Sequence, residues 1–147
     1  MKLLRRFGKE ESGATIAMFA FFVGFVLVPL LGLAIEMGRY SIVRSHVQNA
    51  ADAAALAAAQ EIDVPLWREY GVFEFKPSVY ALAQAYASEN AAELERKGVH
   101  VQVVSISVDP VTKAVEVVCR ADVSSLFPAG VPGTIITQTG TAQVAWR

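Results

Sequence analysis

The chain has 147 residues, of which 54% are hydrophobic and 18% are charged, and its formal net charge is -1. This length fits one small domain plus an anchor, and the near-zero net charge gives no global field that would attract nucleic acid. We therefore expect no nucleic-acid partner. The single cysteine, Cys119, can form neither an internal disulfide nor a thiolate metal site, and we expect no cofactor.

Residues 1–13 form a short basic leader that contains Lys2, Arg5, Arg6 and Lys9. Positive residues beside a membrane span are retained in the cytoplasm, whereas Arg39 and Arg44 on the far side oppose this bias only weakly. The charge pattern predicts a cytoplasmic N-terminus and a periplasmic or otherwise extracytoplasmic remainder.

Residues 14–35 contain no charged side chain and are long enough to cross a membrane. As a helix they reach roughly 33 Å, against a hydrocarbon core of about 30 Å. A cleaved secretory signal would have a shorter apolar region, of about 7–15 residues, followed by a small-residue cleavage site. We therefore predict a single transmembrane helix over residues 14–35.

Three small residues in this span, Ala20, Gly24 and Gly32, are separated by steps of four or eight. They share one helix face, and small residues allow a second helix to approach closely in lipid. Glycine and alanine are also common in spans in general, so a helix partner and a merely typical composition both remain open. Pro29 removes one backbone donor and is predicted to kink the helix.

The helix is predicted to continue through residues 36–63 as a stalk, because no proline or turn pair interrupts this segment and residues 50–59 include eight alanines. An alanine face packs only against a close neighbour, which is either the sheet of the same chain or another subunit; we favour the sheet. Glu36 and Arg39 lie one turn apart and are expected to pair with each other or with lipid headgroups.

Residues 64–147 are predicted to form a small extracytoplasmic head. The connector at residues 64–77 contains four aromatic residues that form a core cluster or lie at the membrane interface, with the core favoured: Trp67, Tyr70, Phe73 and Phe75. A second helix is expected over residues 78–97, capped by Ser78 and ended by Gly98.

The period then changes to the alternation that is typical of strands. Residues 99–108 alternate with a phase shift that predicts a bulge, residues 109–113 read as a turn, and residues 114–123 alternate again. After a loop that contains Phe127, residues 134–147 with Trp146 form a third strand. The expected fold class is α+β, with a small antiparallel sheet of about three strands packed on helix.

The residues that could support catalysis or metal binding are isolated in the sequence. His46 and His100 have no second ligand at metal-binding spacing, and Ser124 and Ser125 have no nucleophile-elbow context. An enzyme is therefore the least favoured class of function.

The N-terminal third is similar to a known family. Its basic leader ends at Gly13, an apolar run with a central proline follows, and two motifs come next: Glu36, Gly38 and Arg39, then Gln48, Ala50, Ala51 and Asp52 before the remaining alanines. This pattern resembles the TadE/TadG-like pilus assembly proteins of the tight adherence (Flp pilus) system, and is closest to the TadG-like N-terminal region. The resemblance implies an inner-membrane, pilin-like component of a pilus for adhesion. Its partners would be pilin-like or pilus-assembly subunits, in a homo- or hetero-oligomer.

The resemblance also implies a prepilin-type cleavage site between Gly13 and Ala14. Relatives of the TadE type carry a glutamate five residues beyond the cut, whereas this chain has Met18 there. The sequence thus does not decide whether the leader is cleaved, and the predicted membrane anchoring does not depend on cleavage. The alternative function is a membrane-tethered periplasmic module that binds a ligand or the cell wall through its aromatic connector or a sheet edge.

Overall fold

The computed structural model describes the backbone of residues 4–126 and 133–144, and the side chains of these residues from Gly13 onward. The predicted roles of Phe127, Trp146 and the basic side chains of the leader lie outside these described residues. The chain divides into two compact units, Met1–Arg39 and Tyr40–Arg147.

The first unit is helical. Helix α1 spans Leu4–Phe22, a π-helical turn η1 spans Val23–Leu27, and helix α2 spans Val28–Gln60, of which the residues from Tyr40 on belong to the second unit. The π turn is closed by the Val28 N–H, which donates to the Val23 carbonyl five residues earlier. It lies directly before Pro29, whose missing N–H weakens the regular ladder. A widened turn thus directly precedes the proline at which the sequence predicts a kink.

The second unit contains an antiparallel sheet in the order β1-β2-β3, with β1 at Val101–Asp109, β2 at Ala114–Val123 and β3 at Thr134–Gln143. The register between β1 and β2 shifts between Val103 and Ser105, which confirms the predicted bulge. At the predicted turn, the Asp109 carboxylate accepts hydrogen bonds from the Val111 N–H and the Thr112 hydroxyl, both at 2.8 Å.

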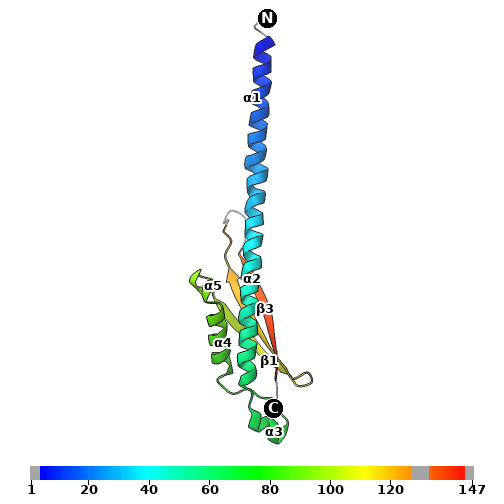
Figure 1. Cartoon of the computed structure of the whole chain (residues 1–147), viewed down its shortest axis with the longest axis vertical. Helices are drawn as coiled ribbons and strands as arrows, with labels where there is room; N and C mark the ends of the chain where they lie inside the picture. Colours follow the sequence, from blue (N-terminus) through cyan, green and yellow to red (C-terminus); the bar gives the residue numbers. More distant parts are fainter. Residues whose placement is uncertain (1–3, 127–132, 145–147) are drawn as a thin grey trace. The chain divides into compact units, whose positions relative to one another are not determined.

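One face of the sheet is buried beneath two helices, as Figure 1 shows for α2 and for α4 (Val79–Asn90). The alternate residues of β2 supply the centre of the core: Val115, Val117, Cys119, Ala121 and Val123. The alanines of residues 50–58 pack on them, and six are at most 1% exposed. The intramolecular interpretation of the alanine face is therefore confirmed, as is the α+β fold class with its three-stranded antiparallel sheet.

The connector at residues 64–77 contains a helix that we did not predict. Helix α3 spans Val64–Tyr70, and the Asp63 carboxylate caps it by accepting a hydrogen bond from the Leu66 N–H at 3.1 Å. Pro65 stands in its first turn, and Gly71 ends it with a left-handed φ of 71°. The sequence therefore contains three standard signals for this helix, which are a capping aspartate, a proline in the first turn and a terminal glycine.

The helix predicted over residues 78–97 is two helices, α4 and α5 (Ala92–Arg96), separated at Ala91. Ala91 itself is the best helix former, but Asn90 before it is a weak one, and its side-chain amide donates to the Tyr86 carbonyl at 2.9 Å. Ser78 stands at the start of α4, but its hydroxyl donates to the Glu61 carboxylate and does not cap the helix. Gly98, at φ 77°, ends α5 as predicted.

Candidate assembly site along the long helix

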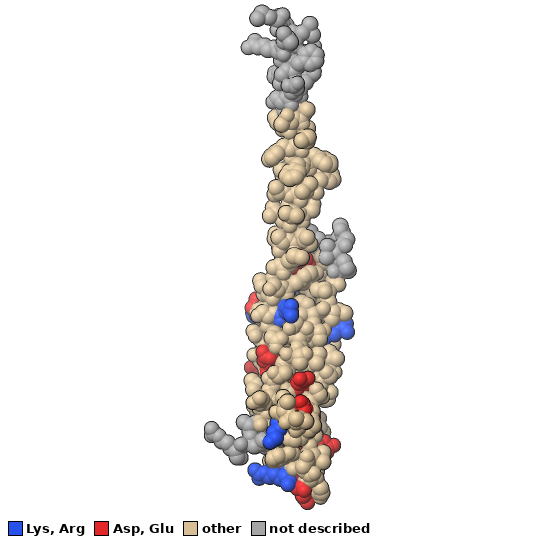
Figure 2. Space-filling view, turned by 90° about the vertical axis from the view of Figure 1, so that its right-hand side faces the viewer, with Lys and Arg blue, Asp and Glu red and all other residues tan. Residues whose placement is uncertain are grey.

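The first feature of the site is an apolar surface that the chain itself leaves uncovered. Among the residues with described side chains, Gly13–Gln60 is the one helix that is long and apolar enough to cross a membrane, and its most apolar stretch is 0% buried. Figure 2 shows this stretch, directly after the grey residues, as a surface without a blue or red side chain. Exposed apolar surface of this extent is unfavourable in water and is compatible with a position in lipid or against other helices.

The small residues form a stripe within this surface. A Cβ built on Gly24 would meet nothing within 4 Å, so no contact inside the chain requires a glycine there. In a regular α-helix each four-residue step advances about 40° past a full turn, so such a stripe drifts around the helix. The π turn at Val23–Leu27 holds more residues per turn and opposes this drift. It thereby helps Ala20, Gly24 and Gly32 to remain on one side.

The acidic motif after the span is held by an ion pair. The Arg39 guanidinium lies 3.5 Å from the Glu36 carboxylate, and the Glu36 residue is only 2% exposed. Pairing within the motif, one of the two predicted arrangements, is thus formed. A buried carboxylate needs such a partner, because an uncompensated charge is costly away from water.

The second motif joins the long helix to the sheet. The Gln48 side-chain amide donates to the Asp52 carboxylate at 2.9 Å and to the Thr139 carbonyl of β3 at 3.0 Å. At the next residue of β3, a Cβ built on Gly140 would lie 2.1 Å from the Ala51 carbonyl oxygen. The backbones of α2 and β3 are therefore in direct contact, which requires glycine on the strand and small residues on the helix.

Glutamine side chains also cap the two edges of the sheet. The Gln84 amide of α4 donates to the Val101 carbonyl and accepts from the Val103 N–H, both at 2.8 Å, as a neighbouring strand would. At the other edge, Gln48 occupies the Thr139 carbonyl and Gln138 occupies the Thr137 carbonyl. Capped edges resist pairing with other chains. This role was not predicted, because a lone glutamine carries no sequence signal for it.

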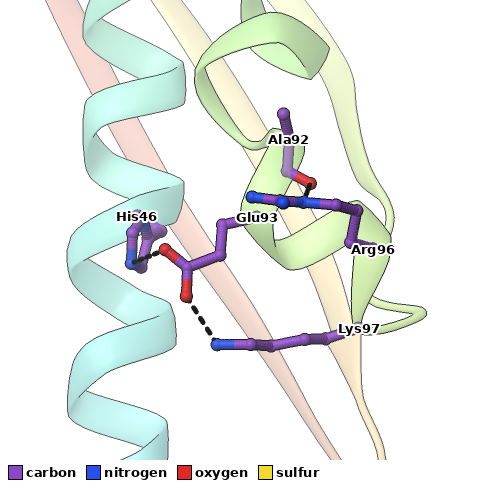
Figure 3. A network of polar contacts seen from close by, with 5 residues as sticks. All are labelled: His46, Ala92, Glu93, Arg96 and Lys97. Atoms are coloured by element: carbon purple, nitrogen blue, oxygen red, sulfur yellow. Dashed lines mark hydrogen bonds and ion pairs between the residues drawn. The ribbon is translucent and has the colours of Figure 1, made fainter.

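A polar network connects α2 to α5 (Figure 3). The Glu93 carboxylate lies 2.7 Å from the Lys97 ammonium and 4.0 Å from His46 Nε2. The hydrogen bond and charge of Lys97, followed by the charge of His46, lower the pKa of Glu93. These side chains are partly or largely exposed, so the network is a surface contact between two helices.

Within the parts of the chain that the structure describes, no group of three or more His, Cys, Asp or Glu side chains could hold a metal ion. Burial raises the pKa of the Cys119 thiol to about 11, so the reactive thiolate is scarce near neutral pH. His46 lies in the network described above.

The aromatic connector contributes to the core more than to the surface. The rings of Trp67 and Phe73 pack with centroids 5.7 Å apart, and Phe73 and Phe75 lie against the core. Tyr70 is 66% exposed. The favoured core interpretation thus holds for Phe73 and Phe75, whereas an exposed cluster of Trp67, Tyr70 and Phe73 is not formed.

Comparison with known proteins adds one match. Residues 13–61, one third of the chain, match the family of Flp pilus-assembly TadE/G-like proteins. No curated protein matches the chain, and no solved structure does. The matched range includes the uncovered apolar surface, the Glu36–Arg39 pair and the Gln48–Asp52 motif, and it ends one residue after α2. The family expectation from the sequence is confirmed over this range, where the chain is similar to the TadE/G-like proteins of Flp pilus assembly.

Proposed function

We propose that the protein is a membrane-anchored structural component of Tad/Flp pilus assembly, either a minor pilin-like subunit or an assembly factor. It acts through helix-helix contacts in the membrane, with other pilus-assembly or pilin-like subunits or with copies of itself. The observation that carries this proposal is the apolar helix, which matches the family and is uncovered by the rest of the chain.

The proposed arrangement has the N-terminus in the cytoplasm, one pass through the inner membrane at residues 14–35, and residues 64–147 as a periplasmic head. The basic leader supports this orientation, because positive residues are retained on the cytoplasmic side. The alanine-rich segment at residues 36–63 would carry the head. The residues of this segment from Tyr40 on belong to the same compact unit as the head, and those from Val43 to Ala58 contribute to its core.

Gly24 is the proposed centre of the helix-packing face, with Ala20 and Gly32 on either side. Gly24→Leu would fill the space that a partner helix needs. With a photo-crosslinking residue in place of Ala20, we expect crosslinked products in native membranes to fall about five-fold or more on this substitution. Val26→Leu, on the opposite side of the helix, is the matched control and should leave crosslinking unchanged. Equal crosslinking in both variants would reject this face.

Affinity purification from native membranes tests the assignment to pilus assembly. We expect pilin-like or pilus-assembly subunits to copurify, and Gly24→Leu to reduce their recovery. Recovery of cell-wall fragments alone, unaffected by Gly24→Leu, would instead support the tethered binding module.

A further inference from the structure

A shallow groove lies at the end of the second unit where α2 enters it. Its walls are Tyr40, Ser41 and Arg44 from α2, and Thr134 and Ile136 from β3, and it encloses about 330 Å³. It thus combines a guanidinium and hydroxyl groups with one apolar side chain. A guanidinium surrounded by hydroxyl donors is suited to a phosphate group.

Arg44 has no ion pair or hydrogen bond among the residues that the structure describes, and it is exposed. Residues 13–60 contain just two Lys or Arg residues, Arg39 and Arg44, and Arg39 is paired with Glu36 at 3.5 Å. Arg44 is therefore the cation of this segment that is available to a ligand from outside the chain.

The position of Arg44 in the helix indicates the source of the phosphate. Arg44 is nine residues beyond Ile35, a rise of about 13 Å along the helix. The headgroup layer of each leaflet extends roughly 5–8 Å beyond the hydrocarbon. Helical side chains lean toward the N-terminus, here back toward the bilayer, and arginine extends its charged end toward headgroups.

From this geometry we infer that the Arg44 groove binds the phosphate of an anionic phospholipid in the leaflet on the side of the head. The inference rests on the proposed membrane anchoring and adds a lipid-selective contact to it. The guanidinium binds the phosphate, and Ser41 and Thr134 donate from their hydroxyls. Such a contact would fix how deeply the helix sits and how it is rotated.

The test uses the full chain in vesicles that contain phosphatidylcholine and a minor share of photoreactive phosphatidylglycerol, with crosslinks mapped by mass spectrometry of chymotryptic peptides. We expect crosslinks at residues 40–44, and Arg44→Gln should reduce them about five-fold. Arg44→Lys should retain most of them. Crosslinks to the basic leader, in the opposite leaflet, should not change, and Arg68→Gln in α3 is the matched control.

Three outcomes would overturn the inference. The first is that photoreactive phosphatidylcholine labels residues 40–44 as strongly as phosphatidylglycerol does. The second is that the Arg44→Gln variant is labelled as strongly as the unchanged chain. The third is that millimolar inorganic phosphate abolishes the labelling, which would indicate a site for free phosphate. Near-UV circular dichroism of each variant verifies that the head is folded. If the leader were also unlabelled, the chain would not be inserted, so failure of anchoring is distinguishable from failure of the lipid contact.

Discussion

The direct contact between α2 and β3 predicts that Gly140→Ala destabilises the head severely for so small a change. The new Cβ would lie 2.1 Å from the Ala51 oxygen and 2.5 Å from the Asp52 nitrogen. Ordinary contact begins at 3.4 Å, so the helix and strand must separate by 1.3 Å, the difference between 3.4 Å and 2.1 Å. The atoms in the way belong to backbone and cannot rotate aside.

The magnitude follows from three contributions. Overpacking costs about 1–3 kcal/mol, loss of the bond from Gln48 to the Thr139 carbonyl costs about 1 kcal/mol, and replacing a strand glycine returns roughly 0.5–1 kcal/mol. The net loss is about 1–3.5 kcal/mol, which lowers Tm by roughly 4–28 °C for a unit of about 100 residues.

Urea unfolding of the detergent-solubilised full chain, followed by near-UV circular dichroism, measures this loss. Gly38→Ala on α2 is the matched control, because a Cβ there would meet nothing within 4 Å, and it should not destabilise the head. Ala51→Gly should not rescue Gly140→Ala, since the obstructing atoms are the Ala51 carbonyl. Wild-type stability of Gly140→Ala, or rescue by Ala51→Gly, would refute the backbone contact.

Three further predictions concern the edge of the sheet, the surface network and the leader. Gln84→Ala should lower the free energy of unfolding in urea by about 1–3 kcal/mol, because it leaves the Val101 carbonyl and the Val103 N–H without this partner. The control Gln102→Ala, on the solvated side of β1, should change it little, and equal losses in the two variants would contradict the capping role. The lowered pKa of Glu93 means that its charge stabilises the fold above its ordinary pKa of 4.5, and that this contribution is lost as pH falls through the lowered value. Glu93→Gln should therefore lower stability at pH 7 but not in strong acid, and a pH-independent difference would exclude the charge as the cause. N-terminal sequencing of membrane-extracted protein should begin before Gly13, since the Gly13–Ala14 bond lies within α1 and Met18 replaces the acidic residue; a sequence that begins at Ala14 would show that the leader is cleaved.

The features that the sequence predicted are those with a local or periodic signal. The uncharged run of residues 14–35, the alanine tract and the alternation of β2 predict their elements directly, and the phase shift near Val103 predicts the bulge. Helix α3 also had local signals in Asp63, Pro65 and Gly71, which the aromatic composition of the connector obscured.

The remaining features depend on contacts between distant residues. From the sequence alone, Gly140 is a residue that weakens a strand. Its role in the close contact with Ala51 depends on the fold, because Ala51 lies 89 positions away in the sequence. From the sequence alone, Gln84 is an ordinary helix residue, and its hydrogen bonds to the edge of β1 could not be predicted.

The most direct test of the central proposal follows the untagged chain through cell fractionation and alkaline washing, and then probes its C-terminus in intact cells and in spheroplasts. If the helix after Gly13 is held in the inner membrane with its leader inside, the chain stays in the washed membrane pellet. A protease added to spheroplasts then removes the head. A chain that remains in the supernatant after ultracentrifugation, or a head that is cut only after the inner membrane is opened, would contradict the proposed anchor and its orientation.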